Sequence, residues 1–243
     1  MINKVIGSVR EALADIPDGA VVAIGGFGWG GWPYNLVLEL AKRKVRNLVG
    51  VGNSPRQFLP LLNVDGHCML RKIISSYPIM KHGSRSDPLA EYIQKGELEV
   101  EGTTMGTLVE RLRAGGAGIP AFYTPVGAGT EVEAGKEKRI FDSRECIMEY
   151  AIKLDYALIK AHKGDRLGNL VYRHTSRNYN PVMAMAAKIT IAQVDNIVDV
   201  SELDPESIVT PGVFVHRVVA KEVETPVEWI EQDKQKIQEA ERR

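Results

Sequence analysis

The stretch "VVAIGGFGWGGWP", residues 21–33, decides how the fold is organised. A short apolar run leads into five glycines within the seven residues from Gly25 to Gly31. Pro33 follows, and it suits the first turn of a helix because its missing N–H would have no partner there. A strand, a glycine loop and a helix in this order are typical of an α/β protein. The bare backbone of the loop can take positive φ and approach a ligand closely.

The same alternation of strands and helices continues along the chain. We predict an amphipathic helix near the N-terminus, with Thr107 as a candidate N-cap for a later helix. This pattern predicts one α/β domain with a mainly parallel open sheet and helices on both faces. The predicted strands cover 20–26, 47–52, 69–77, 97–101, 121–126, 156–162, 169–173, 189–195 and 196–200, and the later helices cover 33–44, 88–96, 106–118 and 180–188.

Composition excludes several classes of protein. The 243 residues carry 31 acidic and 31 basic side chains, so nothing indicates binding to nucleic acid or to an anionic membrane. No apolar stretch approaches the roughly 18 residues needed to span a bilayer. Cys68 and Cys146 are too few for a disulfide framework, and we expect them to be reduced in a cytoplasmic protein. The charged segment 225–243 is predicted to be a terminal helix, either solvated or docked on a partner, after a domain of residues 1–224.

The glycine loop matches the G-x-G-x-x-G spacing of dinucleotide sites at Gly26, Gly28 and Gly31. Such a site also needs an acidic residue about 20 positions further on. No acidic residue lies between Arg46 and Asn63, so a dinucleotide is disfavoured. A tight turn without a ligand is the plainer alternative, but two indoles beside the loop favour a pocket wall. The loop amides would suit an anionic or polarised oxygen.

Other polar segments are weaker candidates for a site. Residues 160–173 form either a solvated hairpin or a place where Lys160, Lys163 or Arg166 meets an acidic ligand or a subunit boundary. Residues 123–130 are a second glycine-rich strand exit, where ligands bind in open α/β sheets. No metal-ligand spacing, G-x-S-x-G elbow or P-loop is present. The residues alone predict a site for an acyl or phosphate-bearing molecule, without a complete catalytic set.

The order of these motifs resembles the A (alpha) subunit of family I coenzyme A transferases, in the group acting on succinyl-CoA and 3-oxoacids. The segment "DGAVVAIGGFGWGGWP" from Asp18 to Pro33 matches the first motif of that family. The segments at 106–130, 157–173 and 183–219 match its later blocks and look nearest to the 3-oxoadipate branch. The resemblance implies the fold of that family, which is also called NagB-like.

The resemblance also implies why no nucleophile is visible. In this family the acyl-CoA is attacked by a glutamate of the B (beta) subunit, and a glutamyl-CoA thioester then passes CoA to the acceptor acid. This chain would bind a CoA thioester as substrate, hold no permanent cofactor or metal, and work in an α2β2 complex. It would transfer CoA from succinyl-CoA to a 3-oxoacid such as 3-oxoadipate or acetoacetate. The implied CoA and acyl contacts are Gly25, Gly26, Phe27, Gly28, Trp29, Gly30 and Gly31.

Departures from the family pattern mark the expected acyl pocket. Trp29 and Gly30 stand where a small residue or cysteine is common, and "GNSPRQF" at 52–58 replaces the usual turn. We expect Trp32, Asn53 and Arg56 to line this pocket. Two indoles would fit a bulky acyl chain, and Arg56 would suit a distal carboxylate. The rival functions are a CoA-thioester hydrolase or C–C-cleaving enzyme on the same scaffold, and a non-catalytic binding protein.

Overall fold

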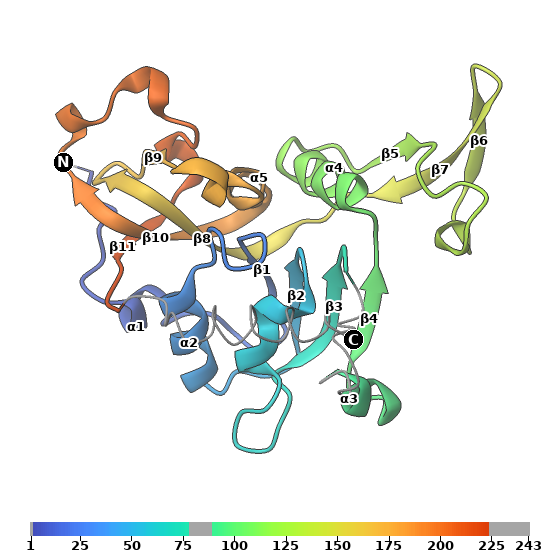
Figure 1. Cartoon of the computed structure of the whole chain (residues 1–243), viewed down its shortest axis with the longest axis horizontal. Helices are drawn as coiled ribbons and strands as arrows, with labels where there is room; N and C mark the ends of the chain where they lie inside the picture. Colours follow the sequence, from blue (N-terminus) through green and yellow to red (C-terminus); the bar gives the residue numbers. More distant parts are fainter. Residues whose placement is uncertain (1, 78–88, 224–243) are drawn as a thin grey trace, which may run out of the picture.

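A computed structural model of the chain describes residues 2–77 and 89–223 (Figure 1). Its centre is an eight-stranded sheet in the order β11-β10-β8-β1-β2-β3-β4, in which β9 pairs with β8 off this path. Every pairing along the path is parallel, whereas β9 is antiparallel to β8. The mainly parallel sheet is therefore confirmed. The strands are β1 Val21–Ile24, β2 Leu48–Gly52, β3 Leu70–Ser75, β4 Glu99–Gly102, β8 Leu154–Asp165, β9 Leu170–Val171, β10 Ala187–Val198 and β11 Arg217–Ala220.

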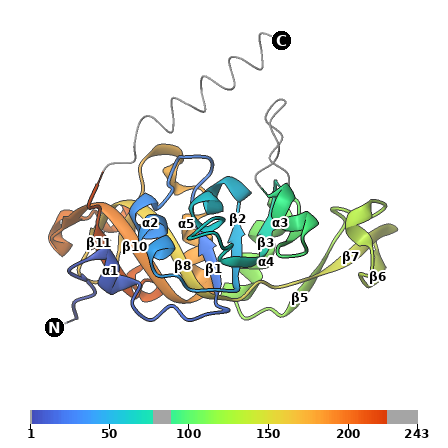
Figure 2. The same ribbon diagram turned by 90° about the horizontal axis from the view of Figure 1, so that it is seen from below.

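Helices cover both faces of this sheet, as predicted (Figure 2). One face packs against the side of the molecule that holds α1, α2 and η1, and the other packs against α4 and α5. The α-helices are α1 Val9–Ala12, α2 Tyr34–Lys42, α3 Ala90–Gln94, α4 Met105–Gly116 and α5 Asn180–Ala186. The 3-10 helices are η1 Pro55–Leu61, η2 Glu131–Glu133, η3 His174–Arg177, η4 Val200–Glu202, η5 Pro205–Ser207 and η6 Gly212–Phe214.

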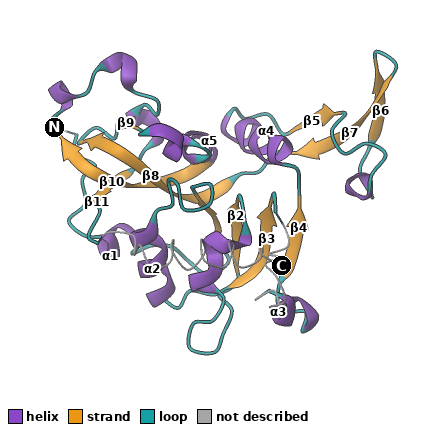
Figure 3. Cartoon of the chain, viewed as in Figure 1, coloured by secondary structure: helices purple, strands orange, loops and turns teal. Residues whose placement is uncertain are grey.

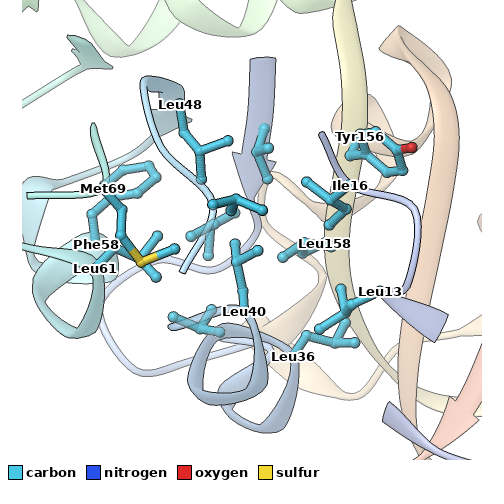
Figure 4. Packing of buried hydrophobic residues seen from close by; sticks show 14 of the residues in the cluster. Leu13, Ile16, Leu36, Leu40, Leu48, Phe58, Leu61, Met69, Tyr156 and Leu158 are labelled. Carbon is cyan, nitrogen blue, oxygen red and sulfur yellow. The ribbon is translucent and has the colours of Figure 1, made fainter. Parts of the chain in front are cut away.

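The two faces of the sheet divide the core into two clusters. In β1, Val22 and Ile24 join the cluster beside α1 and α2, whereas Ala23 joins the cluster beside α4 and α5. This division follows from the alternation of side chains along a strand. Figure 4 shows the first cluster, where Leu36 and Leu40 of α2 lie among buried sheet residues. Strands buried on both faces explain the nearly continuous apolar runs in the sequence.

A second sheet projects from the body as an arm (Figure 3). Its strands β5 Ala121–Thr124, β7 Arg144–Tyr150 and β6 Lys138–Phe141 pair antiparallel in that order. Asp142 and Ser143 connect β6 to β7 with positive φ angles of 48° and 61°, as a two-residue hairpin with right-handed strand twist requires. Only β5 was predicted. The sequence lacks the Asn-Gly or Asp-Gly signal by which such hairpins are recognised.

Several element boundaries differ from the predictions. The N-terminal helix is only α1, because Val5 bridges to Val218 instead of continuing the helix. Thr104 caps α4 in place of Thr107, since the Thr104 side chain accepts from the Thr107 N–H. The two strands expected at 189–200 are one continuous β10. Cys68 and Cys146 are free thiols, as expected. The predicted tail at 225–243 lies outside the described residues.

Candidate functional site

The glycine loop lies at the point where the sheet order reverses. From β1 the chain builds β2, β3 and β4 on one side, and later β8, β10 and β11 on the other. In open α/β sheets, ligands bind beyond the carboxyl ends of the strands at this switch point. The N–H of Gly25 donates to the carbonyl of Leu158 at 2.9 Å, so the loop begins between β1 and β8. The fold alone therefore places residues 25–31 where a ligand is expected.

The loop folds into a tight hairpin that only glycine can follow at several positions. Phe27 and Gly30 exchange two backbone hydrogen bonds of 2.9 and 3.1 Å. Gly26, Gly28 and Gly31 have φ angles of 108°, 58° and 72°, which L side chains rarely adopt. A Cβ at Gly25 would lie 1.8 Å from Oδ1 of Asn180. The glycine-rich sequence is thus required by both conformation and close packing.

Buried amide side chains hold the carbonyl groups of the loop. Gln57, 2% exposed, donates from Nε2 to the carbonyls of Gly25 at 2.8 Å and Gly26 at 3.0 Å. On the opposite side, Asn178 donates to the carbonyl of Gly30 at 2.8 Å and Asn180 donates to that of Gly31 at 3.2 Å. Asn180 is fully buried. A backbone held at both ends cannot rearrange cheaply, because each buried group would lose its partner.

Gln57 was not identified from the sequence, although a signal for it exists. Ser54 caps η1 in a capping box with Gln57, whose Oε1 accepts from the Ser54 N–H at 3.2 Å. The S-x-x-Q spacing is the mark of such a box. One amide therefore starts η1 with its oxygen and fixes the glycine loop with its nitrogen.

The two indoles do not form an open wall as expected. Trp32 is 1% exposed and belongs to the core beside α1 and α2. It meets Trp29 edge to face at 5.0 Å between ring centroids, and Tyr34 at 5.6 Å. The positive φ of Gly31 turns the chain toward α2, and the ring of Trp32 is then buried beneath the loop. Trp32 supports the loop from inside, and only Trp29 remains partly exposed.

The exposed aromatic of the loop is Phe27 instead. Its side chain is 48% exposed, and its ring stacks on Tyr179 at 6.5 Å with an interplanar angle of 8°. The Tyr179 hydroxyl accepts a hydrogen bond from Nδ2 of Asn53 at 3.3 Å. Asn53 is 2% exposed and follows β2, so it comes close to the loop as predicted. Arg56 lies one turn further on, in η1.

A pocket of about 530 Å³ opens next to Tyr179, between the start of α4 and β5. Apolar side chains supply most of its lining, which includes Met105, Val109, Phe122 and Val126. Arg56 and Trp32 do not line it. No sequence pattern indicates that α4, β5 and Tyr179 would meet, since they come from three separate segments. Of the glycine-rich strand exit at 123–130, Thr124 and Val126 do reach the pocket.

The hairpin predicted at 160–173 is present as β8 and β9. Lys160 lies 3.3 Å from Asp195, and Arg166 donates to the carbonyl of Ile2 at 2.7 Å. Within the part of the chain that the structure describes, no three His, Cys, Asp or Glu side chains gather to hold a metal ion. None of the helices in residues 2–77 and 89–223 is long and apolar enough to cross a bilayer.

Comparison with known proteins places these features in a family. The family model described as coenzyme A transferase matches residues 6–221. The chain is 45% identical to the A (alpha) chain of a 3-oxoadipate CoA-transferase of Pseudomonas putida, over 90% of this chain and 94% of that protein. It is 42% identical to the A (alpha) chain of a probable succinyl-CoA:3-ketoacid coenzyme A transferase of Mycobacterium bovis, over 96% and 98%.

A solved structure shows the same fold. Glutaconate coenzyme A-transferase of Acidaminococcus fermentans superposes with a TM-score of 0.76 at 20% identity, over 89% of this chain and 75% of that one. A family model that spans nearly the whole chain, relatives of the same length and a shared fold agree with one another. The chain belongs to the coenzyme A transferase family.

Proposed function

We propose that this chain is the alpha subunit of a two-subunit enzyme that moves CoA from succinyl-CoA to a 3-oxoacid such as 3-oxoadipate or acetoacetate. The observation that carries the proposal is the glycine loop, held at the switch point of the sheet by Gln57, Asn178 and Asn180. The relatives from Pseudomonas putida and Mycobacterium bovis, both named as the first of two kinds of subunit, support the division of labour.

The chemistry needs a nucleophile that this chain does not supply. The thioester carbonyl is attacked by a glutamate of the beta subunit, and a glutamyl-CoA thioester then carries CoA to the acceptor acid. A carboxylate is a weak nucleophile, so the reaction depends on stabilising the oxyanion that forms. Each preorganised donor at an oxyanion contributes about 3–4 kcal/mol. A loop whose carbonyl groups are already held by buried amides reorganises little, which is what preorganisation requires.

The same proposal covers the assembly and its surroundings. The complex is α2β2 and cytoplasmic, and it takes CoA thioesters as substrates without a permanently bound cofactor. Within this chain, the ligand contacts are Gly25 to Gly31 with Phe27 and Trp29, and Asn53 through Tyr179. Trp32 has a supporting role, because its ring is buried in the core.

The test is a transfer assay with this chain alone, the beta chain alone, and the two co-purified. We expect succinyl-CoA and a 3-oxoacid to give the new acyl-CoA only in the mixture. Intact-mass spectrometry after incubation with succinyl-CoA should find CoA attached to the beta chain and not to this one. Transfer by this chain alone would contradict the assignment of the nucleophile. Loss of thioester in the mixture without an acceptor acid would favour a hydrolase.

A further inference from the structure

We propose that the pocket between α4, β5 and Tyr179 holds the acyl chain of the acceptor acid and selects an uncharged chain over one that ends in a carboxylate. The inference rests on the proposed function and deepens it. It sets this chain apart from the relative named for 3-oxoadipate, whose six-carbon chain ends in a second carboxylate.

The pocket is continuous with the glycine loop through one residue. Tyr179 lines the pocket, and its ring stacks on Phe27 of the loop. Asn53 donates to the Tyr179 hydroxyl and lies 3.8 Å from the sulfur of Met105, which also lines the pocket. An acid whose reacting end lies at the loop therefore extends its chain past Tyr179 toward α4 and β5.

The lining of the pocket favours an apolar chain. Met105 and Val126 are 42% and 46% exposed, so this chain leaves unusually large apolar side chains open at the site. Val109 and Phe122 continue the apolar surface from α4 to β5. Burying such a surface against a hydrocarbon chain is favourable, because both leave water. A volume of about 530 Å³ lies within the usual range for small-molecule sites, and it leaves room for chains longer than that of acetoacetate.

The charges at the pocket disfavour a second carboxylate. No lysine, arginine or histidine is among the residues that line it in the described part of the chain. The ionisable side chain there is Glu110, which pairs with Arg113 at 2.8 Å on the exposed side of α4. A distal carboxylate would lose hydration without gaining a cationic partner, and it would approach a like charge. Selection therefore comes from the cost imposed on the charged chain as well as from contacts with the uncharged one.

The experiment uses the co-purified complex with succinyl-CoA as donor and two six-carbon acceptors, 3-oxohexanoate and 3-oxoadipate. These acids differ at the far end of the chain, where one carries a methyl group and the other a carboxylate. We expect kcat/KM to favour 3-oxohexanoate by about tenfold or more, in the range that one changed group is worth in a pocket. Acetoacetate should fall below 3-oxohexanoate, because its shorter chain leaves the pocket partly empty.

Met105→Arg tests the assignment to this pocket by placing a cation in it. We expect the ratio of the two kcat/KM values to shift about tenfold toward 3-oxoadipate. Met185→Arg is the matched control, since Met185 is 37% exposed on α5 and does not line the pocket, and its ratio should remain that of the wild type. Val126→Lys makes the same test from the other side of the pocket if Met105→Arg does not assemble with the beta chain.

Three results would overturn the inference. The first is a wild-type complex that transfers CoA efficiently but prefers 3-oxoadipate. The second is a cationic variant that raises KM for succinyl-CoA and leaves the acceptor ratio unchanged, which would make this a CoA site. The third is a selective loss of 3-oxoadipate transfer in Arg56→Ala, which would move the acyl chain to η1. Failure to transfer CoA to any acid would instead count against the proposed function.

Discussion

The glycine loop and the three-stranded arm are held in place by opposite means. Around the loop, neutral amides of Gln57, Asn178 and Asn180 donate to backbone carbonyls, two of them from almost fully buried positions. The arm has little core of its own: β6 is exposed along its whole length, and Ile140 is 74% exposed. What fixes its base is a group of charges between α4, β4 and β7. The loop should therefore fail when packing is disturbed, and the arm when charge is disturbed.

The largest effect is expected from adding one methyl group to the loop. Gly25→Ala places a Cβ 1.8 Å from Oδ1 of Asn180, so one of the two must move and the amide loses its hydrogen bonds. We expect the free energy of unfolding to fall by about 3 kcal/mol, with CoA transfer falling further because the loop is displaced. Urea unfolding and the transfer assay measure the two effects.

Gly28→Ala is the control within the same loop. Gly28 has positive φ, but a Cβ there would meet nothing within 4 Å. Only the backbone strain of about 1–2 kcal/mol then remains. If both variants lost the same stability, close packing against Asn180 would not be what fixes the loop.

A smaller effect is expected from neutralising the base of the arm. Glu149 of β7 is 2% exposed, and it lies 2.6 Å from Lys136 and 3.9 Å from Nε of Arg111. Glu149→Gln removes the charge and leaves two cations without it. We expect a loss of about 2 kcal/mol, less than for a fully buried pair because Lys136 remains 29% exposed. Hydrogen exchange should speed up in residues 121–150 while residues 21–31 keep their protection.

Glu145→Gln provides the comparison on the same strand. The Glu145 side chain is 48% exposed and pairs with Lys138 at 3.4 Å. Such a surface pair contributes about 0.5 kcal/mol or less. Equal losses in both variants, or faster exchange in residues 21–31, would show that the arm and the loop do not depend on separate interactions.

The smallest effect is a pH dependence at the junction of arm and sheet. Burial alone would raise the pKa of Glu101, but hydrogen bonds from Lys72 and Arg111 outweigh it and hold the pKa below the ordinary 4.5. A carboxyl whose pKa is lower in the folded state stabilises above its unfolded pKa and loses that contribution as pH falls through the folded pKa. Between pH 6 and 3, the stability advantage of the wild type over Glu101→Gln should shrink toward zero. A constant difference over that range would contradict it.

Much of the main sheet could be predicted because its signals are local. The apolar run before Gly25 and Pro33 after the loop mark the ends of β1 and the start of α2 within a dozen residues. The hairpin of β6 and β7 was missed because Asp142 and Ser143 are not the residues that favour its turn. β6 itself is exposed on both faces, so it lacks the alternation that reveals a half-buried strand.

The site was predicted in part for a similar reason. The glycines and Asn53 follow strands, and strand ends of a parallel sheet converge at one edge. The contact of Tyr179 with Phe27, and the pocket it shares with Met105, join residues from distant segments that carry no common pattern. Trp32 was misplaced because residue type shows that a ring needs a surface to pack on, but not whether that surface is a ligand or the core.

The order of the strands also has a consequence for how the protein is made. Gln57 reaches back only 32 residues to the glycine loop, whereas Asn180 is 149 residues from the carbonyl it binds. Chains emerge from the ribosome N-terminus first, so the first support of the loop is available early in synthesis and the second only when three quarters of the chain exists. Until then β1 also lacks β8 as a neighbour. A nascent or truncated chain that ends before Asn180 carries every glycine of the loop and still has no finished site.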